Sequence, residues 1–360
     1  TPENINIDVV RAIAVDNNNS IWIGTSGKGL TRYEPASNSW LTLKAEAQTQ
    51  NTVSSNRIMS LWVDEDNDLW IGTQGGGLNI KKADGQFKHF STDQEKRLSA
   101  NTIWSIYQDN IGRIWLGTRE EGLIEFDKIK GEIKKYRHDP KNKNSLPSNN
   151  IRTIISDDKG NLWIGTESDG ISFFNTKNHA FTTYRQNDGE NSISNNNIKS
   201  LFLDSNGLLW IGTNGGGLNI FDTKNEKFQV FTTEQGLANN VIYAILPDED
   251  RNLWLSSNKG ITKFTPSDTF GSAPEITNYT NYAGLATEFN TGASYKDLEG
   301  NLYFGGLDGF YWFKPDTIKE NTFLPKTTIT GFTVFDKPLA LIDGLELQHD
   351  QNTVSFTFSS

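Results

Sequence analysis

The segment Leu69-Trp70-Ile71-Gly72-Thr73 recurs along the chain, and its spacing decides the fold. Similar copies lie at Ile21–Thr25 (IWIGT), Ile114–Thr118 (IWLGT), Leu162–Thr166 (LWIGT) and Leu209–Thr213 (LWIGT). Two divergent copies follow at Leu253–Ser257 (LWLSS) and Leu302–Gly306 (LYFGG). The aromatic residues of the seven copies are 48, 45, 48, 47, 44 and 49 residues apart. A period in this range is typical of propellers, solenoids and helical repeats.

The second repeat contains four short segments with the composition of strands. Arg57 to Val63 is an apolar run too short for a helix, and Leu69 to Thr73 is β-branched and aromatic. Leu78 to Lys81 and Gln86 to Phe90 follow, each after a turn. Four consecutive antiparallel strands form the blade of a β-propeller. We therefore predict an all-β protein, with a seven-bladed β-propeller of four-stranded antiparallel blades over residues 1–322.

An aspartate precedes the aromatic residue by six positions in every repeat. The seven are Asp16, Asp64, Asp109, Asp157, Asp204, Asp248 and Asp297. An Asp side chain can accept a hydrogen bond from the backbone amide two residues on, which predicts a closed turn between the first two strands. Three residues after the aspartate, six repeats carry Gly or Asn, which tolerate positive φ. Arg251 is the exception and suggests a differently shaped turn.

The aromatic residue and a glycine two positions later lie on the same face of their strand. We expect the aromatic side chain to pack against the next blade, and the glycine to allow close approach of a neighbouring chain or ring. The third strand of each repeat carries an aromatic residue, except that Lys81 takes this position in the second repeat. Aromatic contacts between blades favour a propeller over a solenoid.

The repeat pattern does not supply all the strands needed to close a ring of four-stranded blades. The seventh repeat ends after its third strand, Gly309 to Phe313, and the segment Thr1 to Ile7 is more like a loop than a strand. Closure is therefore expected to be imperfect, unless the missing strand lies in sequence outside this chain. After a polar connector, Asn321 to Lys326, the segments Thr327 to Phe335 and Thr353 to Phe358 alternate like strands around Asp343-Gly344. Residues 323–360 are predicted to begin a separate, truncated β-sandwich.

The composition excludes several classes of function. A net charge of −10 argues against nucleic acid or an anionic membrane surface as partner. With no Cys, disulfides and thiolate metal sites are excluded. No apolar run is long enough to span a bilayer, so membrane attachment is expected only through segments outside this chain. Because the chain begins at Thr1 without a leader, any signal segment is expected to have been removed or left out.

Catalytic and cofactor sites have little support. His89, His138, His179 and His349 are scattered, so no metal site is predicted. The glycine-rich Gln74–Gly77 and Asn214–Gly217 lack the Lys and the helix of a phosphate loop, so no cofactor is predicted. The periodic aspartates have a structural role, which leaves the non-periodic acids as enzyme candidates. These are Glu120, Glu121, Glu167 and Asp169.

A ligand is expected where otherwise similar repeats differ, on the face formed by the loops between second and third strands and between blades. The first set of variable residues lies in these loops and includes Lys28, Arg119, Glu120, Glu167, Asp169 and Asn214. The second set follows the first apolar residue of each inner strand and includes Arg11, Trp104, Arg152, Lys199 and Tyr243, together with Met59. Aromatic and cationic groups at a channel mouth suit sugar rings or anionic sugars. The alternative for each residue is that it is an ordinary solvated surface residue with no role in ligand binding.

The pattern N-x-I-x-x-I-x-x-D-x-x-G-x-L-W-I-G-T-x-x-G-G-L, clearest from Asn196 to Leu218, resembles the two-component regulator propeller repeat. The tail, with Leu345-Glu346-Leu347 and Gln351 to Phe356, resembles the start of the triple-tyrosine immunoglobulin-like domain that follows such propellers. The resemblance implies the periplasmic sensor of an inner-membrane hybrid histidine kinase or diguanylate cyclase, acting as a dimer and without catalytic activity. Well-known relatives have fourteen repeats and respond to oligosaccharides, whereas this chain has seven.

Three functions therefore compete. The leading hypothesis is a ligand-sensing extracytoplasmic domain, in which a small molecule or oligosaccharide alters how the propeller and the tail domain dock within a dimer. The second is a carbohydrate-active enzyme such as a lyase or glycosidase. The third is a protein-interaction scaffold.

Overall fold

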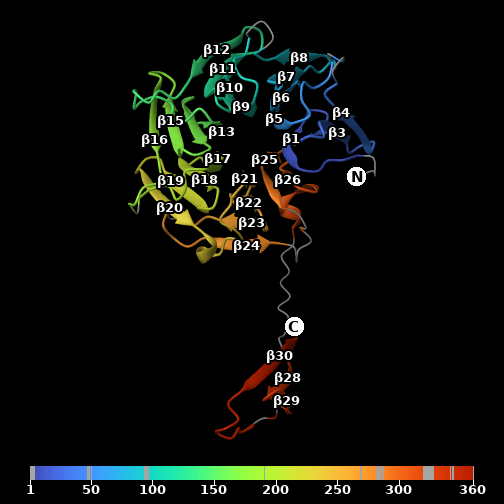
Figure 1. Ribbon diagram of the computed structural model, residues 1–360, viewed down its shortest axis with the longest axis vertical. Coiled ribbons are helices and arrows are strands. Elements are labelled where there is room, and N and C mark those ends of the chain that lie inside the picture. Colours follow the sequence, from blue (N-terminus) through green and yellow to red (C-terminus); the bar gives the residue numbers. More distant parts are fainter. Residues whose placement is uncertain are drawn as a thin grey trace. The chain divides into compact units, whose positions relative to one another are not determined.

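The computed structural model describes residues 5–46, 49, 51–92, 97–189, 191–267, 270–280, 285, 288–318, 328–340, 342 and 344–359. They divide into two compact units, Thr1–Pro315 and Asp316–Ser360. The predicted connector Asn321–Lys326, the predicted boundary at residues 322 and 323, and Asp343 of the predicted turn lie outside the described residues. Both units are built from short antiparallel strands, as Figure 1 shows.

In the described part of the first unit the strands form seven sheets, each an antiparallel meander in chain order. The first three sheets are β1 (Val10–Val15), β2 (Ile21–Thr25), β3 (Leu30–Glu34), β4 (Ser39–Leu43); β5 (Ile58–Val63), β6 (Leu69–Thr73), β7 (Leu78–Lys81), β8 (Phe87–Phe90); and β9 (Ile103–Gln108), β10 (Ile114–Thr118), β11 (Leu123–Asp127), β12 (Gly131–Tyr136). The next two are β13 (Ile151–Ser156), β14 (Leu162–Thr166), β15 (Ile171–Asn175), β16 (Ala180–Tyr184); and β17 (Ile198–Leu203), β18 (Leu208–Thr213), β19 (Leu218–Asp222), β20 (Lys227–Phe231). The last two are β21 (Ala244–Pro247), β22 (Leu253–Ser257), β23 (Gly260–Thr265), β24 (Glu275–Tyr279); and β25 (Phe289–Lys296), β26 (Leu302–Gly306), β27 (Gly309–Phe313). Two short 3₁₀ turns, Thr233–Gln235 and Pro315–Thr317, are the helical elements among the residues described.

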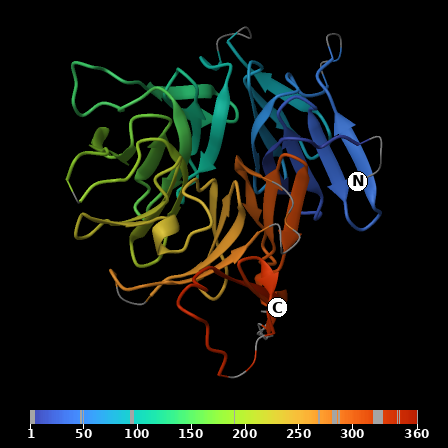
Figure 2. The ribbon, with the colours of Figure 1, turned by 60° about the horizontal axis from the view of Figure 1, so that its bottom comes forward.

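The first strand of each sheet lies on the inside of a ring. β1 contacts β5, β5 contacts β9, and so on through β13, β17, β21 and β25, which in turn contacts β1. Figures 1 and 2 show these inner strands around a common centre, with the later strands of each sheet farther out. The first unit is therefore a β-propeller, and the prediction of an all-β propeller is confirmed.

The recurring aspartates close the turns as predicted. In each sheet the Asp Oδ1 accepts the backbone amide two residues on, as Asp64 does from Asp66 at 3.1 Å, and also the amide four residues on. The residue three positions after the aspartate has positive φ in every repeat, including Arg251 at 68°. The expectation that Arg251 marks a different turn was wrong. Its turn keeps the same left-handed position and places a strained arginine in it.

The tryptophans join neighbouring sheets. Trp70, Trp115, Trp163, Trp210 and Trp254 each contact a phenylalanine on the third strand of the next sheet, with ring centroids 4.9 to 6.0 Å apart. The exception in the pattern is also explained, because the Lys81 ammonium lies 5.3 Å from the ring of Trp22 and replaces the aromatic contact with a cation–π contact. The predicted packing of the aromatic residue on the next blade is confirmed.

The glycine two positions after the tryptophan is required by close approach. A Cβ on Gly72 would lie 2.8 Å from the carbonyl oxygen of Ile103, the first residue of the next inner strand, and 2.2 Å from Ser60 Oγ. On Gly305 it would lie 2.5 Å from Val10, across the junction between the last and the first sheet. Inner strands therefore approach one another at these glycines, and this is what allows seven sheets to share one centre.

The ring closes by packing rather than by a shared strand. Among the described residues the last sheet has three strands, so the expectation of four strands in every blade does not hold there. The Val9 amide donates to the Leu307 carbonyl at 2.7 Å. Ile7 and Val10 are buried in one cluster with Ala293 and Tyr303 of the last sheet. Residues 5–9 form no strand and pack against the last sheet, which agrees with the loop predicted for Thr1 to Ile7 in its described part.

The second unit contains one three-stranded sheet in its described part, in the order β29 (Lys337–Pro338), β28 (Thr328–Val334), β30 (Val354–Ser359). The two predicted strands correspond to β28 and β30. Phe332 and Val334 are buried, and the Phe332 and Phe356 ring centroids are 4.9 Å apart.

Candidate ligand channel

One face of the propeller is organised by a threonine that five of the seven repeats share. In the first sheet the Thr25 side chain donates to the Gly29 carbonyl at 3.0 Å and accepts the Lys28 amide at 2.9 Å, which closes the loop between β2 and β3. Four more sheets repeat the bond to the glycine carbonyl at 2.7 to 2.9 Å. These loops pair with the connections between sheets through the bridges Ser26↔Arg57, Gln74↔Thr102 and Asn214↔Val241. Both predicted sets of loops therefore lie on the same face, near the start of the inner strands.

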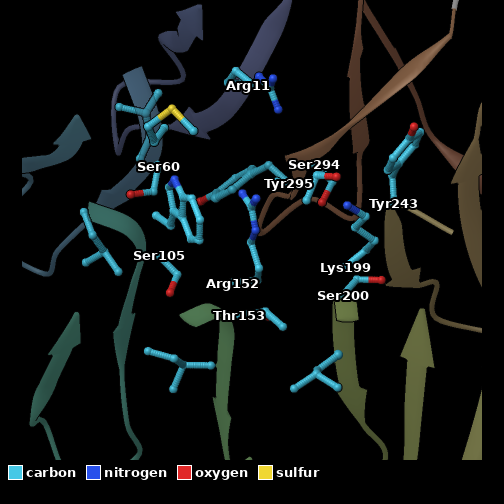
Figure 3. Close-up of a pocket in the computed structure, with 18 of the residues that line it drawn as sticks. Arg11, Ser60, Ser105, Arg152, Thr153, Lys199, Ser200, Tyr243, Ser294 and Tyr295 are labelled. Carbon is cyan, nitrogen blue, oxygen red and sulfur yellow. The ribbon is translucent and has the colours of Figure 1, made fainter. Parts of the chain in front are cut away.

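A cavity of about 340 Å³ lies at the centre of the ring, between the inner strands. It is lined by Arg11, Met59, Trp104, Arg152 and Lys199, which occupy the second position of β1, β5, β9, β13 and β17, and by Tyr243, which directly precedes β21. Figure 3 shows Arg11, Arg152 and Lys199 extending from three different strands into the same space. The structure thus brings together all members of the second variable set.

Arg152 is the most constrained of these side chains. Its guanidinium lies 3.5 Å from the centroid of the Trp104 ring, and its Nη2 pairs with Glu167 Oε1. The Arg119 guanidinium lies farther away, 6.0 Å from the same ring centroid. Trp104 therefore orients an arginine, a use of the aromatic ring different from the sugar stacking expected of it.

None of the six predicted loop residues belongs to the cavity lining itself. Lys28 and Asn214 are exposed, and Glu120 pairs with Arg119 at 3.3 Å with its side chain largely in solvent. Asp169 lies 3.6 Å from Arg185 in an ion pair on the loop surface. Among the loop residues, Glu167 and Arg119 are thus the ones in contact with the lining side chains. The ligand-binding role of all eleven residues stays a prediction.

The cavity has an unbalanced positive charge. Of the described residues that line it, three are cationic and none is Asp, Glu or His. Burial, and next the charge of Arg152, lower the pKa of both Arg11 and Lys199, while Glu167 partly offsets the effect on Lys199. Nε of Arg11 and Nε of Arg152 are buried without a hydrogen-bond acceptor. The described lining therefore carries an excess of positive charge.

Several lining residues were missed by the sequence prediction. Tyr295 comes from β25, and its hydroxyl donates to the Val15 carbonyl at 3.4 Å. The hydroxyls of Ser60, Ser105 and Ser200 line the cavity with no partner among the described atoms. The three serines occupy the same position of their repeats, so a search for residues that vary between repeats does not select them. Tyr295 follows an irregularity between Phe289 and Ser294 that shifts the register of the strand and hides its equivalence.

The acidic groups give little basis for a metal or catalytic centre. Asp64, Asp66 and Asp68 could geometrically hold a cation, with oxygens within 4.8 Å of one another. Lys128 Nζ already lies among them, at 2.9, 2.8 and 2.6 Å, so the protein supplies its own cation. Glu121 is held by Lys135 and Arg137 at 2.9 and 3.0 Å. Each of the four acids considered for catalysis has a cationic partner.

A family profile described as two component regulator propeller matches residues 4–27, 97–120, 145–168, 192–215 and 236–259. Each matched segment reaches the second strand of a sheet and ends at or just after it. The chain carries two component regulator propeller repeats. The triple-tyrosine resemblance of the tail is untested by this match, which stops before the second unit.

Relatives of known structure have the same fold. The chain is similar to the extracellular domain of the hybrid two component system BT4673 from B. thetaiotaomicron, with 23% identity, a TM-score of 0.52, and coverage of 90% of this chain and 44% of that one. It is also similar to virginiamycin B lyase from Staphylococcus aureus, with 14% identity, a TM-score of 0.61, and coverage of 85% and 94%. At these identities both comparisons support the propeller fold and nothing further.

One curated relative matches in sequence. Histidine kinase P4 from Formosa agariphila is 28% identical over 138 aligned residues, which cover 34% of this chain and 10% of that protein. The repeats described here thus correspond to a small part of that kinase, and the chain spans under half of the BT4673 domain. Within the described residues no helix is long and apolar enough to cross a membrane.

Proposed function

We propose that this chain is the non-catalytic sensor region of a membrane signalling receptor of the histidine kinase or diguanylate cyclase type. The main observation is the central cavity, where repeats that are otherwise alike differ at one position, which carries Arg11, Trp104, Arg152, Lys199 and Tyr243. Shared residues build the sheets, and departures from the repeat are concentrated where a ligand can reach several sheets at once. The regulator repeats and the kinase relative support this proposal.

We propose a single seven-bladed ring as the architecture of the sensor. The cyclic contacts of the inner strands and the sealed junction between the last and first sheets support it. The second unit is proposed to be the start of an immunoglobulin-like module of the triple-tyrosine kind. Its sheet leaves Val354, Phe356 and Phe358 exposed, as expected of one layer of a sandwich.

The proposed setting is the periplasm, with the chain forming part of an inner-membrane receptor dimer. A small-molecule or oligosaccharide ligand would act by changing how propeller and tail module dock between the two copies. A ligand shifts such an equilibrium only by its differential affinity for the two arrangements, so the cavity must differ between them. The extracellular domains among the similar structures support this placement.

Sensing is favoured over catalysis by the chemistry of the lining. Glycosidases and lyases need a general acid or base that contacts the substrate. The described lining offers three cations, two tryptophans and tyrosines, and the acids nearby are held in ion pairs. A carbohydrate-active enzyme and a protein-interaction scaffold remain as distinct outcomes of the test below.

The test is a thermal-shift screen of the purified chain against neutral and charged oligosaccharides. A ligand present at one hundred times its Kd should stabilise the fold by about 2.7 kcal/mol. Chromatography of each stabilising ligand after long incubation should recover it intact, and in the full receptor the same ligand should change kinase or cyclase output. Cleaved ligand would assign an enzyme instead. Stabilisation by a protein partner and by none of the glycans would assign a scaffold.

A further inference from the structure

The charge at the centre of the ring is opposite to that of the whole chain. The protein has a net charge of −10, yet Arg11, Arg152 and Lys199 meet in one cavity whose described lining has no carboxylate. They come from β1, β13 and β17, strands far apart in the sequence. Like charges that are brought together and partly desolvated lower the stability of the fold, so this arrangement calls for a functional explanation.

The cations are only partly compensated within the protein. Arg152 is paired with Glu167 and stacked on Trp104. In the part of the chain that the structure describes, Arg11 and Lys199 have no carboxylate partner. The buried Nε atoms of Arg11 and Arg152 lack an acceptor as well. Guanidinium groups are planar donors suited to two-point contact with carboxylate or sulfate oxygens.

From this geometry we infer that the channel binds an anionic group, a carboxylate or sulfate carried by the ligand, between Arg11, Arg152 and Lys199. The inference rests on the proposed sensor function and narrows its ligand class to acidic or sulfated molecules. Trp104 and Glu167 are positioning residues, because they hold the Arg152 guanidinium in place, while Arg11 and Lys199 supply the charge that Glu167 does not neutralise. Figure 3 shows the three cationic side chains directed into the space that the group would occupy.

The first experiment uses the bare groups as probes. Sodium sulfate and sodium acetate are titrated into the chain at constant ionic strength, with sodium chloride as reference, and the melting temperature is followed. Lys199→Met keeps the apolar stem and removes the charge, and Lys199→Arg restores a cation. Lys177→Met is the matched control, since Lys177 is an exposed cation in the turn after β15 and outside the lining.

We expect sulfate or acetate to stabilise the wild type, Lys199→Arg and Lys177→Met beyond chloride. For Lys199→Met the affinity should fall by about ten-fold or more, the usual effect of losing one charge-assisted contact. In the absence of ligand, the melting temperature of Lys199→Met should equal or exceed that of the wild type, because a like-charge contact is removed. A drop in that temperature together with unchanged ion binding would show that the cations have a structural role, and would overturn the inference.

The second experiment compares galacturonic acid, galactose 6-sulfate and galactose by calorimetry, which separates the two sources of the anionic group. Binding of either charged sugar over galactose, lost in Lys199→Met, supports the inference. Binding of neutral sugars that is unaffected by Lys199→Met overturns the inference but leaves the sensor proposal intact. Sulfate bound at the channel, with no ligand changing the output of the full receptor, would instead contradict the sensor proposal alone.

Discussion

At the scale of single residues, the bond between aspartate and tryptophan links a turn to the core. The indole Nε1 of Trp22, Trp70, Trp115, Trp210 and Trp254 donates to Oδ2 of the aspartate six residues earlier, at 2.8 to 3.2 Å. In the seventh repeat the Tyr303 hydroxyl makes the same bond to Asp297 at 3.0 Å. A partly buried carboxylate needs hydrogen-bond donors. The seventh repeat therefore keeps a donor to its aspartate although the tryptophan is replaced by a tyrosine.

Trp210 offers a direct test of this bond. Trp210→Phe and Trp210→Tyr remove a similar apolar volume, but the tyrosine hydroxyl can donate to Asp204 as Tyr303 does to Asp297. We expect the Phe variant to be about 1.5–3 kcal/mol less stable than the Tyr variant, the range for hydrogen bonds to charged groups. Urea unfolding followed by circular dichroism measures the difference. Equal stabilities would mean that the ring packing alone matters.

At the scale of the element, turns serve as joints between sheets. Lys128, in the turn after β11, reaches back to the turn between β5 and β6 and binds Asp64, Asp66 and Asp68. Lys82 also pairs with Asp68, whose side chain is 2% exposed. This joint binds one edge of the second sheet to the third, and its strength comes from burial of the acceptor rather than from surface attraction.

Removing Lys128 should weaken the joint. Lys128→Ala leaves a buried carboxylate with Lys82 as its remaining cationic partner, so we expect a loss of about 2 kcal/mol in the free energy of unfolding. Lys177→Ala, in the exposed turn after β15, is the control and should change it by less than about 0.5 kcal/mol. Denaturant titration of both variants gives the comparison. Equal losses would indicate a general effect of lysine removal.

The same joint predicts a dependence on pH. Burial by itself raises the pKa of Asp68, but hydrogen bonds from Lys128 and Lys82 lower it overall. A carboxylate with a lowered pKa in the folded state contributes stability above its unfolded pKa of about 3.9, and that contribution is lost as the pH falls through the folded pKa. The stability difference between wild type and Lys128→Ala should therefore be full near pH 7 and shrink below about pH 4. A difference that is constant with pH would rule out the ionic explanation.

At the scale of the whole molecule, one junction lacks a chain connection. The chain itself bridges six junctions between neighbouring sheets. The first and last sheets meet through side-chain packing, the hydrogen bond from the Val9 amide to the Leu307 carbonyl and the hydrogen bond from the Tyr295 hydroxyl to the Val15 carbonyl. Gly305 lies at this junction, facing Val10, and Gly165 occupies the equivalent place at a connected junction, facing Ile198. The two glycines form a matched pair.

Gly305→Ala and Gly165→Ala each add a methyl group where none fits, with nearest atoms at 2.5 and 2.6 Å. We expect Gly305→Ala to increase hydrogen exchange in both β1 and β25–β27. No chain segment connects these two sheets directly, so they can separate while the rest of the ring stays folded. Gly165→Ala should destabilise the fold globally without such a local opening. Mass-spectrometric hydrogen exchange distinguishes the two, and identical exchange maps would contradict the idea of a weak junction.

Much of the candidate site followed from the repeat. Arg11, Trp104, Arg152, Lys199 and Tyr243 were found because they vary at one position of an otherwise constant strand, and all five line the cavity. The loop residues were less predictable. Asn214 shares its sequence position with Arg119 and Glu167, but whether a side chain on a loop turns inward depends on its rotamer and partners, which spacing does not encode.

The periodic sequence by itself determined the sheets, their turns and the contact of each tryptophan with the next sheet. These features depend on local hydrogen bonds and on residues a fixed distance apart, so a one-dimensional pattern carries them. Only the tertiary structure decided that the ring closes without a fourth strand in its last described sheet, that Trp104 holds Arg152, and that three cations from distant strands share one cavity. The physical reason is that these contacts join residues up to almost 300 positions apart, as Val9 and Leu307 are, whose mutual distance is fixed by the curvature of the ring and not by any neighbouring residue.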